Sequence, residues 1–386
     1  MTELAAVLRE RFEVRLAAPA GSDGVAEYDP RSPASLARCM RGVDVMLAPP
    51  LAPATLATRR RPPWVCDLYN PELFEGLEVH AQRSPRRRRA LDVVRIDRLA
   101  YAARTADAFV CASERQRDMW LGFLGASRRV RTADHARDRD LRELIDVVAA
   151  GVPDAPATRS GQPPLRGSAL PADARIVLWN GGLWPWLDPE LVARAVAALR
   201  RADPRWVLVV SGSSRPRSGV GADATRTLRA HLPDGGLHVA ADWTPYAQRA
   251  DLLLEADLGV CMHRHGVEAR FADRTRLLDC VWTGLPIVCA AGDAMSDIVA
   301  ARGLGRVVAT GDEAALCAAL TEVVQRGRAA YADALAALAA ERRWSAVAAP
   351  LIAAIERVAA RPPRRPDLVA RMVAARHETA RRIGGR

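Results

Sequence analysis

Basic residues and a predicted helix start meet in the stretch from His263 to Asp293, HRHGVEARFADRTRLLDCVWTGLPIVCAAGD. We expect Asp273 to cap a helix whose first turn contains Arg274 and Thr275. The free N–H groups and the dipole at such a helix start favour an anion. Arg274 and Arg276 add positive charge, and arginine forms charge-assisted hydrogen bonds with phosphate oxygens. The stretch therefore predicts a site for a diphosphate.

Two acidic residues flank this predicted helix start. Glu268 precedes it and is expected in a loop, whereas Asp279 follows one turn further along, where its carboxylate can accept hydrogen bonds from a ribose. His263 stands at the end of a predicted strand, where it either packs or lines the site. Taken singly, each charged residue fits a solvated helix face. Together, they indicate a nucleotide site.

Two further segments of the second half follow predicted strands. Gly181 and Gly182 come after the first strand, where paired glycines either let backbone N–H groups approach a ligand closely or form a tight turn. Trp243, Thr244 and Tyr246 come after the third strand, where they either hold a nucleobase or begin a helix. The glycine pair is neither a GxGxxG nor a P-loop pattern, so nicotinamide-dependent and ATPase functions lose support.

The elements that position these residues follow from an alternation of short apolar runs with helical segments, which is typical of parallel sheets with crossover helices. In the first half, strands are expected at 14–19, 44–49, 64–69, 108–113 and 146–152, with helices at 2–11 and 85–105. In the second half, strands are expected at 175–179, 206–211, 237–240, 257–262, 286–290 and 305–309, alternating with helices at 189–201, 222–231, 246–255, 273–283, 293–301 and 312–340. The second half therefore predicts a complete doubly wound sheet, in which ligands bind where the strand order reverses.

The length of 386 residues indicates two domains. Residues 153–172 contain five prolines together with small residues, which is typical of a linker. We therefore expect an N-terminal domain at 1–152, a linker at 153–172 and a nucleotide-binding domain at 173–345. A C-terminal helix with an Arg- and Pro-rich tail, at 346–386, is expected to pack back toward the N-terminal domain.

The composition narrows the possible partners. The net charge is +11, and all 56 basic residues are arginine. This bias fits genome composition, and no nucleic-acid-binding signature accompanies the charge, so we expect no nucleic-acid partner. The seven cysteines form no CxxC pair, which indicates reduced thiols rather than a disulfide frame or a zinc site. Because neither an 18-residue apolar run nor a signal-peptide layout occurs, we expect a cytoplasmic protein.

Motifs of the second half resemble those of a known family. The patterns F-x-x-R-T-R and L-D-x-x-W-x-G-L-P resemble the donor-site motif of family-4-like glycosyltransferases (glycosyl transferases group 1), through Phe271, Arg274, Thr275, Arg276, Leu278, Asp279, Trp282, Gly284, Leu285 and Pro286. The runs GGLWPWLD at 181–188 and ASERQRDMWLG at 112–122 resemble the same subgroup. Ten residues separate Glu268 from Asp279, where the family usually has seven and a second glutamate. The subgroup carries the same longer loop.

The resemblance implies an α/β chain of the GT-B fold, in which two Rossmann-like doubly wound parallel-sheet domains face a cleft. It implies a hexosyltransferase-type enzyme (EC 2.4) of polysaccharide or glycoconjugate biosynthesis, which moves a sugar, with retention, from a nucleoside-diphosphate sugar to a saccharide, lipid-linked or small-molecule acceptor. Catalysis is expected to need no cofactor and no metal, because arginines and a helix N-terminus can meet the charge of the leaving diphosphate. No D-x-D motif occurs in the second half.

The same resemblance assigns roles to residues. Glu268 would touch the donor sugar, and His263 and Asp67 would lie near the transferred sugar. The nucleotide would be held by Gly181, Gly182, Trp243, Thr244, Tyr246, Arg274, Thr275, Arg276 and Asp279, with the base at Trp243–Tyr246, the diphosphate at the arginines and Thr275, and the ribose at Asp279.

The start of the chain departs from the family pattern. Family members begin with a strand and a Gly-rich loop, whereas here a helix at 2–11 precedes the strand at 14–19. We therefore expect the first strand and its loop to be absent from the N-terminal domain. This departure keeps an inactive nucleotide-sugar-binding relative as an alternative function, and a sugar-nucleotide epimerase on the same fold as another.

An arginine run, Arg83–Arg89 (RSPRRRR), precedes the long helix of the first half. It is either a solvated helix start or a contact with anionic lipid or a lipid-diphosphate acceptor. Polybasic segments gain about 1 kcal/mol per residue near an anionic surface. The second alternative would bring peripheral contact with the inner face of an anionic membrane.

Overall fold

The computed structural model describes residues 2–19, 26–29, 32–56, 61–81, 83–161, 165–211, 222–233, 235–240 and 248–384. The chain forms two compact units: unit 1 comprises Met1–Ala149 and Trp344–Arg386, and unit 2 comprises Ala150–Arg343. The described part of segment 153–172 belongs to unit 2. There, the Ser160 N–H donates to Asp251 Oδ1 (2.7 Å) and the Leu165 N–H to Glu255 Oε2 (2.9 Å). Composition cannot reveal these hydrogen bonds, because their acceptors lie some 90 residues further along the chain.

The main sheet of unit 1 has four parallel strands in chain order: β3 (Met46–Ala48), β4 (Trp64–Asp67), β5 (Ala108–Cys111) and β6 (Ile145–Val147). These strands are present where the apolar runs predict them, but they are shorter. The predicted strand at 14–19 is reduced to β1 (Ala17–Pro19), which pairs only with β2 (Ala26–Tyr28) in a separate parallel pair.

Helices cover both faces of this sheet because successive side chains of a strand point to opposite sides. The helices of unit 1 are α1 (Thr2–Arg9), α2 (Pro33–Cys39), α3 (Glu72–Val79), α4 (Pro85–Thr105), α5 (Glu114–Ala126), α6 (Thr132–Arg137), α15 (Trp344–Val347), α16 (Ala349–Ala359) and α17 (Leu368–Gly384). On one face, the strands pack against α2, α4, α5 and α17 through Trp64, Cys66, Phe109, Leu36, Leu99, Trp120 and Ala370. On the other face, they pack against α1 and α16 through Val65, Val110, Leu4, Leu8, Leu351 and Val358.

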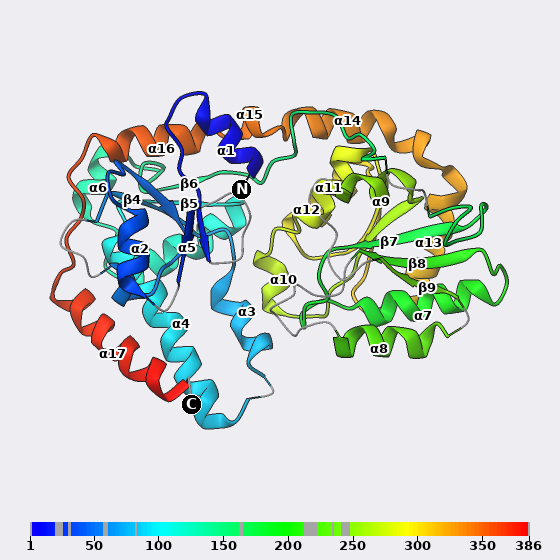
Figure 1. The fold of residues 1–386 in the computed structure, drawn as a ribbon, viewed down its shortest axis with the longest axis horizontal. Coiled ribbons are helices and arrows are strands. Elements are labelled where there is room, and N and C mark those ends of the chain that lie inside the picture. Colours follow the sequence, from blue (N-terminus) through cyan, green and yellow to red (C-terminus); the bar gives the residue numbers. More distant parts are fainter. Residues whose placement is uncertain are drawn as a thin grey trace. The chain divides into compact units, whose positions relative to one another are not determined.

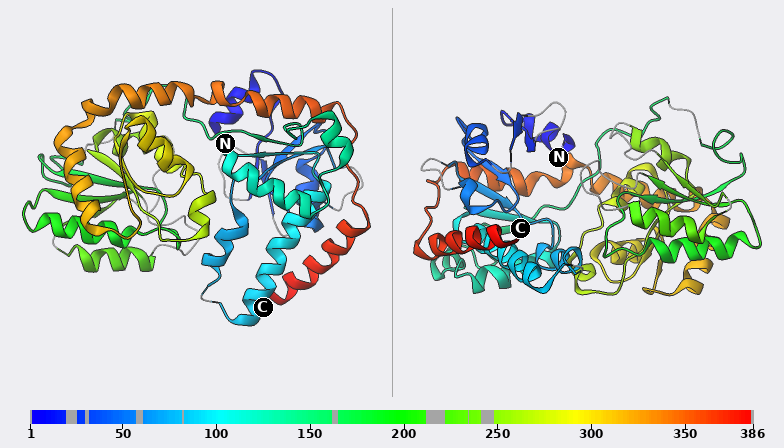
Figure 2. Two further views of the ribbon diagram at one scale, coloured as in Figure 1. Left: turned by 180° about the vertical axis from the view of Figure 1, so that it is seen from behind. Right: turned by 60° about the horizontal axis from the view of Figure 1, so that its bottom comes forward.

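The C-terminal helix α17 lies alongside α4, and the two run antiparallel (Figures 1 and 2). Arg104 near the end of α4 forms an ion pair with Asp367, whose Oδ1 also accepts from the Ala370 N–H at the start of α17 (2.8 Å). Further along, Arg376 of α17 forms an ion pair with the fully buried Asp97 of α4. Two chain segments more than 250 residues apart are therefore joined by charge as well as by packing.

Unit 2 contains six parallel strands in the order β12-β11-β10-β7-β8-β9. They are β7 (Arg175–Asn180), β8 (Trp206–Ser211), β9 (Leu237–Val239), β10 (Leu258–Cys261), β11 (Ile287–Ala290) and β12 (Gly305–Val308). The order reverses between β7 and β10, which are neighbours in the sheet. The predicted doubly wound sheet is confirmed, and the reversal defines the edge at which ligands bind in such sheets.

The helices of unit 2 are α7 (Pro189–Arg200), α8 (Ala222–His231), α9 (Arg249–Glu255), α10 (Val267–Phe271), α11 (Arg276–Thr283), α12 (Ala294–Arg302), α13 (Glu313–Arg326) and α14 (Ala332–Glu341). Helices α7 and α8 lie on one side of the sheet and α9 and α11 on the other (Figure 1). The continuous helix predicted at 312–340 is wrong. Gly327 has a φ of +71° and ends α13, so the segment continues as a short 3₁₀ turn, Arg328–Tyr331, before α14.

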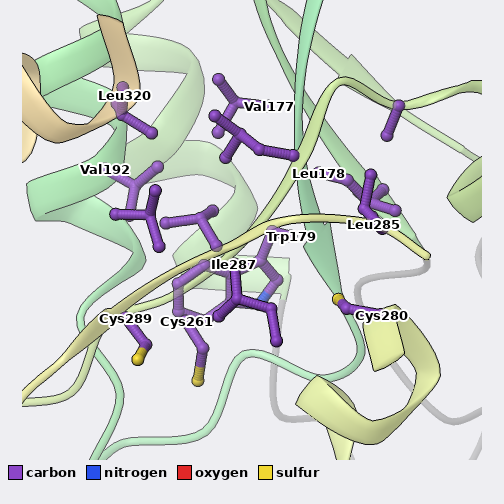
Figure 3. Packing of buried hydrophobic residues seen from close by; sticks show 14 of the residues in the cluster. Val177, Leu178, Trp179, Val192, Cys261, Cys280, Leu285, Ile287, Cys289 and Leu320 are labelled. Carbon is purple, nitrogen blue, oxygen red and sulfur yellow. The ribbon is translucent and has the colours of Figure 1, made fainter. Parts of the chain in front are cut away.

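The core of unit 2 is apolar along the central strands. Val177, Leu178 and Trp179 of β7 are fully buried, with Ile287 of β11 (Figure 3). Cys261 and Cys289 lie opposite each other on β10 and β11. All seven cysteines are free thiols, as the sequence predicts, and burial raises the pKa of Cys280 and Cys289 above the ordinary thiol range. These thiols act as small apolar side chains.

Candidate nucleotide site at the sheet edge of unit 2

The carboxyl ends of β7 and β8 carry polar side chains that bind one another. Ser211 Oγ at the end of β8 accepts a hydrogen bond from the Gly181 N–H (2.9 Å) and donates to Asn180 Oδ1 (3.0 Å). Asn180 Nδ2 in turn donates to Asp279 Oδ2 on α11 (2.9 Å). Asn180 is thereby fixed between two strands and a helix, beside the reversal of strand order.

Asp279 receives a second contact from an arginine. The Arg249 Nε of α9 lies 3.3 Å from Asp279 Oδ1, and the Arg249 guanidinium lies 4.5 Å from the ring centroid of Trp282. Burial raises the pKa of Asp279, and the charge of Arg249 opposes that rise. We call Asn180, Ser211, Arg249 and Asp279 the edge network. It holds a half-buried carboxylate in a fixed orientation at the sheet edge.

The glycine pair passes close to a second arginine. Gly181 has a φ of +102°, which L side chains rarely adopt, and a Cβ there would lie 3.6 Å from Arg276 Cζ. Arg276 donates to the Gly182 carbonyl (3.0 Å), and its guanidinium lies 5.4 Å from the ring centroid of Trp179. The structure therefore brings the predicted residues Gly181, Gly182, Arg276 and Asp279 together on neighbouring strand ends and one helix.

Arg274 and Glu268 form a different group. Arg274 donates to both oxygens of Glu268, at 2.8 and 3.1 Å, and both side chains are buried. Glu268 lies in the short helix α10, so its predicted position in a loop is wrong. Both carboxylate oxygens of Glu268 are thus engaged by one planar guanidinium in a bidentate pair.

Asp293 and His263 complete this group. Asp293 caps α12 by accepting from the Ser296 N–H (2.7 Å), and its Oδ2 lies 3.6 Å from Arg274 Nε and 3.8 Å from His263 Nε2. His263 Nδ1 lies 3.1 Å from the Arg264 carbonyl, while the buried Nε2 has no hydrogen-bond partner within the described ranges. Burial lowers the pKa of His263. We call Glu268, Arg274, Asp293 and His263 the buried charge cluster.

The predicted helix start needs correction. Helix α11 begins at Arg276 rather than at Asp273, and Thr275, exposed, occupies its N-cap position without a capping side chain. Arg274 therefore precedes the helix, and its side chain is buried in the ion pair with Glu268. Burial raises the pKa of Asp273 to about 6.

The remaining predicted site residues are not part of this assembly. Asp67 lies at the end of β4 in unit 1, where its Oδ1 accepts from the Tyr69 N–H (3.0 Å) and burial raises its pKa to about 6. Trp243, Thr244 and Tyr246 lie outside the residues that the structure describes.

Four polar residues of these two groups were not among the predicted site residues. They are Asn180, Ser211, Arg249 and Asp293. Position just after a strand is a signal that could have found Asn180, Ser211 and Asp293. No local pattern marks Arg249, because its partner Asp279 lies 30 residues further along the chain.

The described part of the chain shows no group of three or more His, Cys, Asp or Glu side chains placed to hold a metal ion. Within the same residues, every helix is too short or too polar to cross a membrane.

Comparison with known proteins finds likeness in structure alone. No family model matches the sequence, and no curated protein matches it either. The solved structure of WaaG, a glycosyltransferase involved in lipopolysaccharide biosynthesis, matches with a TM-score of 0.58 at 14% identity, over 92% of this chain and 93% of that chain. A UDP-forming α,α-trehalose-phosphate synthase from Burkholderia xenovorans matches with a TM-score of 0.60 at 16% identity, over 86% and 77% of the two chains.

A third similar structure is that of HepE from Anabaena in complex with UDP and glucose, with a TM-score of 0.58 at 14% identity, over 84% of this chain and 82% of that chain. At such identities the likeness concerns the fold. The chain has the GT-B fold of glycosyltransferases, with two Rossmann-like domains built on parallel sheets.

Proposed function

We propose that the protein is a glycosyltransferase that takes a sugar from a nucleoside-diphosphate sugar bound at the sheet edge of unit 2. The edge network is the observation that carries this proposal. It presents a carboxylate, Asp279, fixed by Asn180 and Arg249 at the reversal of strand order, beside a glycine turn and Arg276. Carboxylates suit ribose hydroxyls, and arginines suit phosphate oxygens.

In this proposal Asp279 accepts hydrogen bonds from the ribose. Arg276 and Thr275 bind the diphosphate at the start of α11. Gly181 and Gly182 have no side chains, so the phosphates can approach the backbone of this turn closely. Trp243, Thr244 and Tyr246 are proposed to hold the base. Arg274 acts indirectly in this scheme, because its guanidinium is buried against Glu268.

The reaction breaks the bond between the sugar's anomeric carbon and the diphosphate oxygen, and forms a bond from that carbon to an acceptor hydroxyl oxygen, whose proton is released. The negative charge that develops on the diphosphate is stabilised by Arg276 and the helix start, without a metal ion. We propose that the configuration is retained. In unit 2, His263 and Glu268 remain the proposed neighbours of the transferred sugar, and the role of Asp67 in unit 1 stays a prediction.

The acceptor is proposed to be a saccharide, a lipid-linked group or a small molecule. Arg86, Arg88 and Arg89 are exposed in the first turns of α4, which supports peripheral contact with an anionic membrane.

Calorimetry with UDP, GDP and dTDP, combined with assays of donor hydrolysis and transfer, tests the proposal. We expect one nucleotide to bind and Arg276→Ala to weaken its binding by about tenfold or more, since a hydrogen bond to a charged group contributes about 1.5–3 kcal/mol. Arg205→Ala, at an exposed arginine paired with Asp203 before β8, is the matched control. The diphosphate assignment is wrong if both variants bind like the parent protein.

One observation favours a second candidate, an inactive nucleotide-sugar-binding relative. Glu268, which the family resemblance places at the donor sugar, has both oxygens engaged by Arg274. Tight nucleotide binding without hydrolysis or transfer would support this candidate. Formation of an altered nucleotide sugar in the absence of any acceptor would instead identify a sugar-nucleotide epimerase.

A further inference from the structure

A cavity of about 310 Å³ lies in unit 1, between α4, α17 and the short 3₁₀ turn Pro53–Leu56. Its lining residues are Pro53, Ala54, Tyr101, Pro366, Arg371, Ala374, His377 and Glu378. The volume is at the lower end of the range for small-molecule pockets, about 300–1,000 Å³. The cavity combines apolar walls with a few polar groups, which is the usual composition of such pockets.

His377 is the most unusual member of this lining. Its side chain is 2% exposed, yet Nδ1 is buried without a hydrogen-bond partner among the described residues. Buried polar groups are nearly always hydrogen-bonded, so each exception needs an explanation. Burial lowers the pKa of His377, so the ring is neutral near pH 7 and offers one donor and one acceptor nitrogen. Because Nδ1 is closed off even from water, a ligand in the cavity can bond to it only after the ring has turned.

The charges around the cavity do not cancel. Glu378 is engaged by Arg381 (3.0 Å) and Arg382 (3.3 Å), which satisfies its negative charge. The exposed Arg371 side chain makes no hydrogen bond or ion pair within the part of the chain that the structure describes. The cavity therefore presents an uncompensated cation beside a neutral histidine.

Apolar side chains are also exposed on α17, outside the lining of the cavity. Leu368 and Met372, one turn apart on the helix, are 73% and 64% exposed, and Val369 is also exposed. Arg371 lies within the same turn. The site thus offers a positive group to an anion and apolar surface to a carbon chain.

We propose that this cavity binds an anionic amphiphile, a phosphate or carboxylate head group on an aliphatic body. Arg371 pairs with the head group, and the aliphatic body lies in the cavity against Pro53, Tyr101 and Ala374. This site shares no residue with the proposed nucleotide site, because all of its lining residues belong to unit 1.

Calorimetry on the full chain tests the proposal, with octyl phosphate as the probe and inorganic phosphate and octanol as its separate halves. We expect octyl phosphate to bind at least about tenfold more tightly than either half. Arg371→Ala should weaken its binding by about tenfold or more, the loss expected for one hydrogen-bonded charge. Arg365→Ala removes an exposed arginine that does not line the cavity and should leave the affinity unchanged.

A second variant separates the cavity from general attraction of anions to a basic protein. Ala374→Phe keeps every charge but fills the cavity, so octyl phosphate binding should be lost while the circular dichroism spectrum and UDP binding are retained. The proposal is overturned if Ala374→Phe binds octyl phosphate like the parent protein, or if Arg365→Ala weakens binding as much as Arg371→Ala does.

Vesicles of phosphatidylglycerol distinguish two sources of the amphiphile. Competition between these vesicles and octyl phosphate, lost in Ala374→Phe, would support a membrane lipid as the source. Absence of competition, with octyl phosphate still bound in an Arg371-dependent manner, would support a free amphiphile.

Discussion

The edge network and the buried charge cluster each pair an arginine with a carboxylate in the same unit, but they differ in burial. In the edge network, the carboxylate of Asp279 is half-buried and meets Asn180 and Arg249. In the buried charge cluster, Glu268 is 4% exposed and Arg274 is 6% exposed. A ligand can reach the first group directly, whereas it can reach the second only after the Glu268–Arg274 pair has opened.

Because of this difference in burial, we expect the two groups to have different roles. A buried ion pair gains little net stability over an apolar pair, but loss of one partner leaves a charge without compensation. The buried charge cluster therefore holds α10, the start of α11 and the cap of α12 in one arrangement. The edge network, fixed by hydrogen bonds yet accessible, is suited to recognise a ligand. Replacements in the buried charge cluster should act on stability, and those in the edge network should act on binding.

The largest effect is expected for Arg274→Met, which leaves Glu268 and Asp293 buried without their cation. The free energy of unfolding should fall by about 3–5 kcal/mol, as measured by urea denaturation. Arg270→Ala, at an exposed position of α10, is the control and should change stability by no more than about 0.5 kcal/mol.

The double variant Arg274→Met with Glu268→Leu refines this test. Replacing both charges by apolar side chains should recover most of the loss, because no charge of that pair is then buried alone. An unchanged denaturation midpoint for Arg274→Met would contradict the assignment of the cluster to stability.

A smaller effect, on binding, is expected for Asp279→Ala. Affinity for UDP, or for whichever nucleotide binds, should fall by about 10–100-fold, since a hydrogen bond to a charged group contributes about 1.5–3 kcal/mol. Glu341→Ala, which removes another carboxylate paired with an arginine (Arg302, 2.6 Å), should leave calorimetric affinity unchanged. Equal losses in both variants would mean that the edge network does not contact the nucleotide.

The pH dependence of stability reports on a further carboxylate, Asp273, which belongs to neither group. Its folded pKa is raised from 3.8 to about 6, so between these values the folded state binds more protons than the unfolded state. This contribution is present below pH 3.8 and is lost as the pH rises through about 6. Asp273→Asn should therefore gain stability relative to the parent protein between pH 4 and pH 7, by about 1–3 kcal/mol. Urea denaturation across this range checks the sign; a constant difference would contradict it.

The sequence predicts the sheet of unit 2 well because strand and helix periods are local properties. Each of its six strands lies where an apolar run predicts it, and Gly284 ends α11 with a φ of +64° as the Gly-Leu-Pro turn indicates. The break at Gly327 was missed because alanine-rich sequence on both sides continues the helical pattern. The predicted start of α11 was wrong because tertiary contacts, rather than a capping side chain, determine it.

The sequence predicts which residues gather near the sheet edge better than it predicts their partners. Strand ends meet in any parallel sheet, so Gly181 and His263 are identifiable by position. The burial of a residue depends on which other elements of the fold pack over it. Nothing in the spacing of Glu268 and Arg274 indicates that they bind each other rather than a ligand. The spacing of the motif therefore predicts which residues lie near one another. Only the three-dimensional structure shows that they divide into two charged groups.

The smallest effect is expected at the glycine turn. Substitutions there distinguish a cost in backbone strain from a loss of nucleotide binding. Alanine at Gly181, which has a φ of +102°, should cost about 1–2 kcal/mol of stability, and its methyl group would lie 3.6 Å from Arg276 Cζ. Alanine at Gly284, with a φ of +64° and open space around it, should cost a similar amount. Only Gly181→Ala should also weaken nucleotide binding, because it alone disturbs the turn beside Arg276. Denaturation and calorimetry on the same two variants decide the matter: equal losses of affinity would show that the turn supports the fold and does not contact the phosphates.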